Sequence, residues 1–281
     1  MMRKDEIDLS GIDRVQLFGR CWLPEADIDP SIIICLVHGL YEHSGRYESF
    51  AEFFTESGIG VYSFDLRGHG RSPGKRGHIT DYNDYLDDVE SLLKVARTEH
   101  NDSAIVLYGH SLGGNIVANY ILRNSMSELA AVVLSSPWLQ LAFELPKGKL
   151  KLAKIMNKIY PGYSEKGVID ANDISKDEAI VKAYQIDPLN QWNISARLFL
   201  SALEKGQWAE DNANKLKIPT LVFCGGDDKI VSAESSGRFV EKSEGQAVYK
   251  KYPGVRHEPH NDIERKQILN EVLNWVQKQV K

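Results

Sequence analysis

Short apolar runs alternate with helical patterns along most of this chain, and the alternation is interrupted once, by a long central segment. Residues 32–37 are continuously apolar, as expected for a strand buried on both faces. Residues 47–57 then show a helical pattern, which Gly58 ends. Strands and helices that alternate in this way predict a mostly parallel, doubly wound α/β sheet with right-handed crossovers.

The same alternation predicts the remaining regular elements. Residues 15–23 alternate as a half-exposed strand would, and Gly11-Ile12-Asp13 is a candidate hairpin turn from a first short strand. Further strands are predicted at 59–64, 104–108, 130–134, 219–223 and 247–251. Further helices are predicted at 82–100, 112–123, 233–242 and 262–280.

The interruption runs from Trp138 to about Asn214. It contains two or three helical patterns and three prolines, but no convincing buried strand. Because it follows the carboxyl end of a strand, an insertion of this length would lie above the sheet as a cap. We predict a core of residues 1–137 and 215–281 and a helical cap of residues 138–214.

Composition excludes several classes of protein. The 281 residues are 42% apolar and 26% charged, which is typical of a globular chain with a sizeable core. The net charge of −5 argues against a nucleic-acid partner. Three widely spaced cysteines fit neither a disulfide framework nor a zinc site, and we expect buried thiols in a reducing compartment. The first residues lack the apolar stretch of a secretory signal, so we expect a soluble, cytoplasmic protein.

One serine lies in the setting of a catalytic nucleophile. Gly109-His110-Ser111-Leu112-Gly113 matches G-x-S-x-G, follows a predicted buried strand and opens a predicted helix. Glycines suit a turn too tight for side chains, and the helix N-terminus places N–H groups beside Ser111. A serine that only caps the helix is the structural alternative.

Such a serine needs a base, and the base needs an acid to orient it, both on loops at the same sheet edge in the order Ser, acid, His. Asp228 follows the strand predicted at 219–223, and His257 follows the strand predicted at 247–251. Asp227 and His260 are the alternatives; we favour Asp228 for its spacing to Ile-Val. We favour His257 over His260 because His260 would lie on the first turn of the last helix.

An oxyanion hole is also expected, with backbone donors from two loops. The N–H of Leu112 follows the nucleophile, and the loop after the strand at 32–37 offers the N–H of Leu40, where Gly39 lets the backbone turn. We expect Tyr41, His110 and Trp138 to contact the substrate. No metal or organic cofactor is required by this chemistry.

Several segments together resemble the α/β-hydrolases of the monoacylglycerol lipase and lysophospholipase group. The resemblance is carried by the segments 38–47 (HGLYEHSGRY), 64–74 (FDLRGHGRSPG), 109–114 (GHSLGG) and 187–189 (DPL), together with those around Asp228 and His257. The family usually has glycine at the position of Tyr41, so a tyrosine there is a departure that bears on the shape of the pocket mouth.

The resemblance implies an α/β-hydrolase fold with a helical cap over an acyl pocket. It implies Ser111 as nucleophile, Asp228 as acid, His257 as base, and Leu40 and Leu112 as oxyanion donors. Glu42, His43 and Arg46 match a loop segment that we interpret as structural support. The implied substrate is a small acyl ester, a monoacylglycerol or lysophospholipid; Ser111 argues against relatives with an aspartate nucleophile.

Residues 151–159 of the predicted cap form an amphipathic basic helix. Leu152, Ile155, Met156 and Ile159 share one face, and lysines lie on another. The helix could pack on the core with a solvated lysine face, which we favour, or make a weak peripheral contact with an anionic membrane surface.

Three other functions fit parts of the pattern. A small-ester esterase would use the same serine, and an aminopeptidase would hold the substrate amine with acidic cap residues. A ligand-binding homologue without activity would not need the serine, histidine and acid together. The sequence carries no signal for an oligomeric state.

Overall fold

The computed structural model describes the whole chain except residues 1, 12, 26–28, 124–127, 168 and 281. Its main sheet has eight strands in the order β1-β2-β4-β3-β5-β6-β9-β10. The strands are β1 (Arg3–Ser10), β2 (Gln16–Leu23), β3 (Ile32–Val37), β4 (Ile59–Phe64), β5 (Ala104–His110), β6 (Ala131–Ser135), β9 (Thr220–Gly225) and β10 (Ala247–Tyr252). The β1–β2 and β2–β4 pairs are antiparallel, and every other neighbouring pair is parallel. The predicted doubly wound α/β fold is therefore confirmed.

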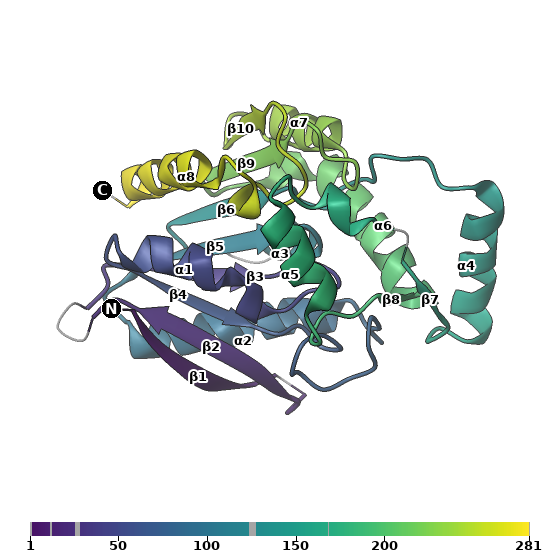
Figure 1. Cartoon of the computed structure of the whole chain (residues 1–281), viewed down its shortest axis with the longest axis horizontal. Coiled ribbons are helices and arrows are strands. Elements are labelled where there is room, and N and C mark those ends of the chain that lie inside the picture. Colours follow the sequence, from purple (N-terminus) through teal and green to yellow (C-terminus); the bar gives the residue numbers. More distant parts are fainter. Residues whose placement is uncertain (1, 12, 26–28, 124–127, 168, 281) are drawn as a thin grey trace.

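Helices cover both faces of this sheet, which explains the continuously apolar strands (Figure 1). Side chains of β3 alternate between two apolar cores: Ile33, Cys35 and Val37 join one, and the residues between them join the other. The first core includes the apolar stripes of α2 (Asn83–Glu99), α3 (Leu112–Ile121) and α7 (Ala233–Lys242). The second includes those of α1 (Glu48–Thr55) and α8 (Arg265–Gln279).

Two predicted boundaries need correction. The helix predicted at 47–57 is a 3₁₀ turn, η1 (Ser44–Tyr47), followed by α1. The last helix begins at Arg265 rather than 262, because a separate 3₁₀ turn, η4 (Pro259–Asn261), precedes it. Ile12 of the predicted hairpin turn lies outside the described residues; β1 and β2 on either side of it pair as an antiparallel hairpin. All three cysteines are free and buried.

In the described part of the segment between β6 and β9 there are three α-helices and no strand that is buried throughout. Its elements are α4 (Lys147–Ile159), β7 (Ser164–Lys166), η2 (Ala171–Asp173), α5 (Glu178–Ile186), β8 (Asn193–Ser195), α6 (Ala196–Asp211) and η3 (Ala213–Lys215). The short strands β7 and β8, which the sequence does not signal, pair with each other and not with the main sheet. The division of the chain into core and cap stays a prediction.

The favoured interpretation of the basic helix, packing on the core, is wrong. No residue of α4 is buried, and the apolar side chains of Leu152, Ile155 and Ile159 are 44%, 43% and 75% exposed. Figure 1 shows α4 at one end of the molecule, separated from the sheet by α6. Among the described residues, no helix is long and apolar enough to cross a membrane.

Candidate active site

Ser111 lies at a tight turn between β5 and α3. Its backbone has φ = 53° and ψ = −115°, a left-handed conformation that residues with side chains rarely adopt. The turn is possible because Gly113 has no side chain: a Cβ there would lie 2.1 Å from the carbonyl oxygen of Val37. A Cβ on Gly109 would likewise lie 2.5 Å from the carbonyl oxygen of Gly113. The glycines of G-x-S-x-G are thus required by backbone contact between β3, β5 and α3.

Loops after β9 and β10 bring an aspartate and a histidine to this serine. His257 Nε2 lies 2.9 Å from Ser111 Oγ, and His257 Nδ1 lies 2.8 Å from Asp228 Oδ2. The backbone N–H groups of Ile230 and Val231 donate to Asp228 Oδ1 at 2.8 and 3.0 Å, which fixes the carboxylate. The three side chains are linked in the order that a serine hydrolase needs.

The two alternative residues lie elsewhere. Asp227 is exposed and makes no ion pair with His257, whereas the Asp228 side chain is fully buried beside it. His260 lies in η4 and not on the last helix as predicted. Its ring stacks on Tyr47 with 4.9 Å between centroids, and neither ring nitrogen has a hydrogen-bond partner among the described residues. Burial lowers the pKa of His260 to about 4, so this ring is neutral at ordinary pH.

The electrostatics of His257 suit a general base. Burial lowers its pKa, but the Asp228 carboxylate, with smaller contributions from Glu258 and Glu42, raises it, and together they outweigh burial, so the net pKa lies above the usual 6.5. His110, whose ring centroid lies 4.9 Å from that of His257, has its pKa lowered well below normal by burial and by the neighbouring histidines. It therefore places no positive charge beside the base.

The predicted oxyanion donors, Leu112 and Leu40, have backbone N–H groups without a partner in the described part of the fold. Leu112 is the first residue of α3, where backbone N–H groups have no partner within the helix. Leu40 lies in the loop after β3, and no described residue accepts a hydrogen bond from its N–H. Gly39 brings this loop close to the nucleophile: a Cβ on Gly39 would lie 3.1 Å from the Cβ of Ser111.

A buried ion cluster joins the loop after β3, which carries Leu40, to the loop after β10, which carries His257. Arg46 donates to Glu42 Oε2 at 2.6 Å and to both carboxylate oxygens of Glu258 at 2.7 and 2.8 Å. Glu42 in turn accepts from the Gly39 N–H at 2.6 Å. The predicted supporting role of Glu42 and Arg46 thus has a definite geometry, and the sequence analysis missed Glu258, which directly follows His257.

The third residue of the supporting segment, His43, connects to the segment between β6 and β9. Its Nε2 lies 3.0 Å from the Asp187 carboxylate. Asp187 belongs to the Asp-Pro-Leu segment that contributes to the family resemblance. The loop after β3 is therefore joined both to the loop after β10 and to the predicted cap.

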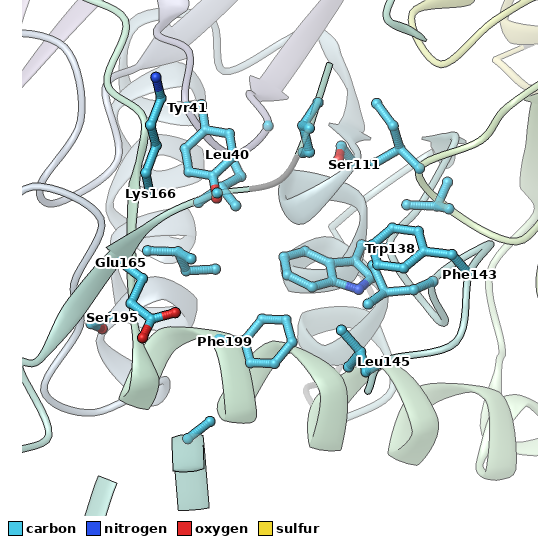
Figure 2. A pocket seen from close by; sticks show the side chains of 18 of the residues that line it. Leu40, Tyr41, Ser111, Trp138, Phe143, Leu145, Glu165, Lys166, Ser195 and Phe199 are labelled. Carbon is cyan, nitrogen blue, oxygen red and sulfur yellow. The ribbon is translucent and has the colours of Figure 1, made fainter. Parts of the chain in front are cut away.

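An apolar cavity of about 160 Å³ lies next to Ser111 and His257. Tyr41, His110 and Trp138, the three residues predicted to contact substrate, all line it. Figure 2 shows Trp138, Phe143 and Leu145 on one side of this space. Tyr41 and the charged residues Glu165 and Lys166 lie on the other side. No group of three or more metal-ligating side chains capable of holding an ion was found in the described part of the chain.

A serine on a strand-to-helix turn, paired with a histidine and an acid at the carboxyl edge of a parallel sheet, defines a serine hydrolase of the α/β-hydrolase fold. Comparison with known proteins agrees. Residues 28–264 match the family described as serine aminopeptidase, S33 (Hydrolase_4), and the chain belongs to this family. It is a serine hydrolase that acts on esters.

Its relatives include lipases and a phospholipase. The chain is 33% identical to the monoacylglycerol lipase of Mycolicibacterium smegmatis over 97% of both chains. It is 30% identical to the phospholipase YtpA of Bacillus subtilis, over 88% of this chain and 95% of that protein. Among solved structures, the monoacylglycerol lipase of Paleococcus ferrophilus matches 94% of this chain and 99% of its own length, with a TM-score of 0.83 and 32% identity.

Proposed function

We propose that this chain hydrolyses monoacylglycerols or lysophospholipids and releases a fatty acid through an acyl-enzyme on Ser111. The observation that carries the proposal is the linked set of Ser111, His257 and Asp228 at the base of a cavity with a wall of large apolar side chains. Relatives named as monoacylglycerol lipases and a phospholipase support this substrate class.

In the proposed mechanism, His257 Nε2 takes the proton of Ser111 as its Oγ attacks the ester carbonyl carbon. The N–H groups of Leu40 and Leu112 stabilise the negative oxygen of the tetrahedral intermediate. His257 then returns the proton to the leaving alcohol oxygen, and the C–O bond breaks. A water molecule, deprotonated by the same nitrogen, attacks the acyl-enzyme and releases the fatty acid and free Ser111. Asp228 keeps the ring oriented and stabilises its positive charge.

The exposed apolar face of α4 supports a weak peripheral contact between the predicted cap and a lipid surface. Leu152 and Met156 of the same helix line the cavity, so a lipid taken from the surface would have a short path inward. The lysines of α4 would favour anionic lipids.

An aminopeptidase function, suggested by the family description, has less support from the cavity. Of the acidic cap residues that could hold a substrate amine, Glu165 lines the cavity. Its carboxylate already accepts a hydrogen bond from the Tyr163 hydroxyl at 3.0 Å, so it is not free for an amine alone. Glu210 instead pairs with Arg238 on α7 at 2.8 Å.

The test is hydrolysis of a series of monoacylglycerols and p-nitrophenyl esters from two to eighteen acyl carbons (roughly the range that separates esterases from lipases by burial of CH₂ groups). We expect activity to peak at medium or long chains and to vanish in Ser111→Ala. Ser57→Ala, an exposed serine at the end of α1, is the matched control and should retain full activity.

Three other outcomes would redirect the proposal. Activity confined to acetyl and butyryl esters would make the protein a small-ester esterase with the same nucleophile. Preference for aminoacyl anilides would make it a peptidase. Failure of the wild-type serine to react with a fluorophosphonate probe would indicate a ligand-binding protein without hydrolase activity.

A further inference from the structure

Tyr41 adopts a backbone conformation that is costly for a residue with a side chain. Its φ is 70°, in the left-handed region that favours glycine. The residue directly follows Leu40 in the loop after β3 and precedes Glu42 of the buried ion cluster. Strain of this kind persists where the surrounding structure holds the residue in place, and it frequently marks a functional position.

The tyrosine ring is held firmly against the segment between β6 and β9. Only 2% of the residue is exposed, and its ring centroid lies 6.4 Å from that of Trp192. The backbone N–H of Gln191 donates to the Tyr41 carbonyl oxygen at 3.1 Å. The hydroxyl end of the ring lies so close to Gly167 that a Cβ on Gly167 would be 1.9 Å from the Tyr41 hydroxyl oxygen. The position of the hydroxyl is therefore fixed by the fold.

No described residue forms a hydrogen bond with this hydroxyl. Buried tyrosine hydroxyl groups normally have a partner, because an unpaired polar group is costly inside a protein. The hydroxyl is not one of the fully enclosed polar atoms, and Tyr41 lines the cavity, with its ring directed into it in Figure 2. Burial also raises the pKa of Tyr41, so the phenol keeps its proton and remains a donor. A ligand in the cavity can supply the missing partner.

The surroundings of Tyr41 indicate which part of an ester would lie there. Trp138, Phe143 and Leu145 form the opposite, apolar side of the cavity and suit an acyl chain. Tyr41 shares its side with Glu165 and Lys166. A hydrocarbon chain offers no hydrogen bond to a phenol, whereas the alcohol part of a glycerol ester carries free hydroxyl groups.

We propose that the Tyr41 hydroxyl binds a free hydroxyl group on the alcohol part of the substrate, and that it thereby selects esters of polyols over esters of simple alkanols. The inference deepens the proposed function and rests on it for the nucleophile. Tyr41 acts here as a specificity residue that contacts substrate and takes no part in the bond changes.

The test compares two esters of one acyl chain, 1-dodecanoylglycerol and methyl dodecanoate, in the wild type and in Tyr41→Phe. Phenylalanine keeps the ring and removes no hydrogen bond within the described structure, so the fold should be retained. We expect kcat/KM for the glycerol ester to fall about tenfold, in line with loss of one hydrogen bond, and kcat/KM for the methyl ester to change by less than about twofold. Tyr160→Phe, an exposed tyrosine outside the cavity lining, is the control and should change neither.

If Tyr41→Phe lowers kcat/KM equally for both esters, or for neither, the inference is overturned. Gly167→Ala provides a second variant, because its Cβ must displace the Tyr41 hydroxyl; it should also weaken the preference for the glycerol ester. If the wild type hydrolyses short acyl esters alone, the proposal of a lipid substrate is rejected. The role of Tyr41 can then still be tested by comparing kcat/KM for glyceryl monoacetate and methyl acetate. The two failures are thus distinguishable.

Discussion

Replacing Arg46 by methionine should reveal how strongly the buried ion cluster supports the site. Arg46 is the cation between two carboxylates, those of Glu42 and Glu258, and all three side chains are less than a tenth exposed. Methionine fills much of the same space but leaves two buried carboxylates without their cation. Breaking a buried pair in this way costs about 3–5 kcal/mol of unfolding free energy. For a chain of 281 residues that corresponds to a fall in Tm of about 5–9 °C.

The pH dependence makes this prediction specific. In the wild type, burial raises the pKa of Glu258 but Arg46 lowers it by more, to about 2. Its stabilising effect is therefore complete above the unfolded value of about 4.3 and is lost as the pH falls from there towards 2. Without Arg46, we expect burial, which is the largest influence on this carboxyl, to raise the pKa of Glu258 above its unfolded value. The variant should then regain stability as the pH falls, so its deficit relative to the wild type should shrink between pH 7 and pH 4.

The assay is urea unfolding followed by tryptophan fluorescence at several pH values, with Arg71→Met as the control. Arg71 pairs with Glu6 at the surface, where the two side chains are 46% and 65% exposed, and its loss should cost about 0–1 kcal/mol. The reasoning is refuted if Arg46→Met costs no more than this control, or if its deficit is the same at pH 7 and pH 4.

Three further predictions follow from the site and from α4. Asp228→Asn should lower kcat by about three to four orders of magnitude. It should also move the acid limb of the pH–rate profile to lower pH, because the carboxylate no longer raises the pKa of His257. An acid limb at the same pH as in the wild type would contradict this. Gly113→Ala should lower Tm by several degrees, measured calorimetrically, since its Cβ would lie 2.1 Å from a backbone oxygen of β3; an unchanged Tm would mean that the turn relaxes. The double variant Ile155→Ser, Ile159→Ser should keep its Tm within about 2 °C of the wild type, because both side chains are exposed. It should nevertheless co-sediment less with anionic vesicles. Unchanged co-sedimentation would show that α4 is not the lipid contact.

Periodicity predicted the central strands β3, β4, β5, β6 and β9 because each is buried between two layers and is therefore largely apolar. The strand β2 lies nearer the sheet edge and gave an alternating pattern instead. The same spacing selected Ser111, Asp228 and His257, which the structure brings within hydrogen-bond distance at one sheet edge. The glycines around Ser111 gave the signal, since a turn of this kind excludes side chains.

Features that depend on tertiary contacts were not predicted. The Arg46–Glu258 pair joins residues 212 positions apart, and no local pattern marks it. The exposure of α4 also escaped prediction, because an amphipathic pattern describes a helix that packs on protein and one that faces a lipid surface equally well. Tyr41 gave a signal only through its departure from the family pattern; its positive φ explains why glycine is usual there.

The lack of buried side chains on α4 has consequences for how the molecule unfolds and for which substitutions it tolerates. A 13-residue helix is marginal in water by its own propensity, and α4 gains little from packing. It should therefore open as a separate local unit, with amide hydrogens that exchange far faster than those of the enclosed α3. Substitutions along α4 would then leave global stability nearly untouched. Selection, or a protein engineer, can therefore change the lipid contact and the cavity lining that α4 provides without destabilising the rest of the fold.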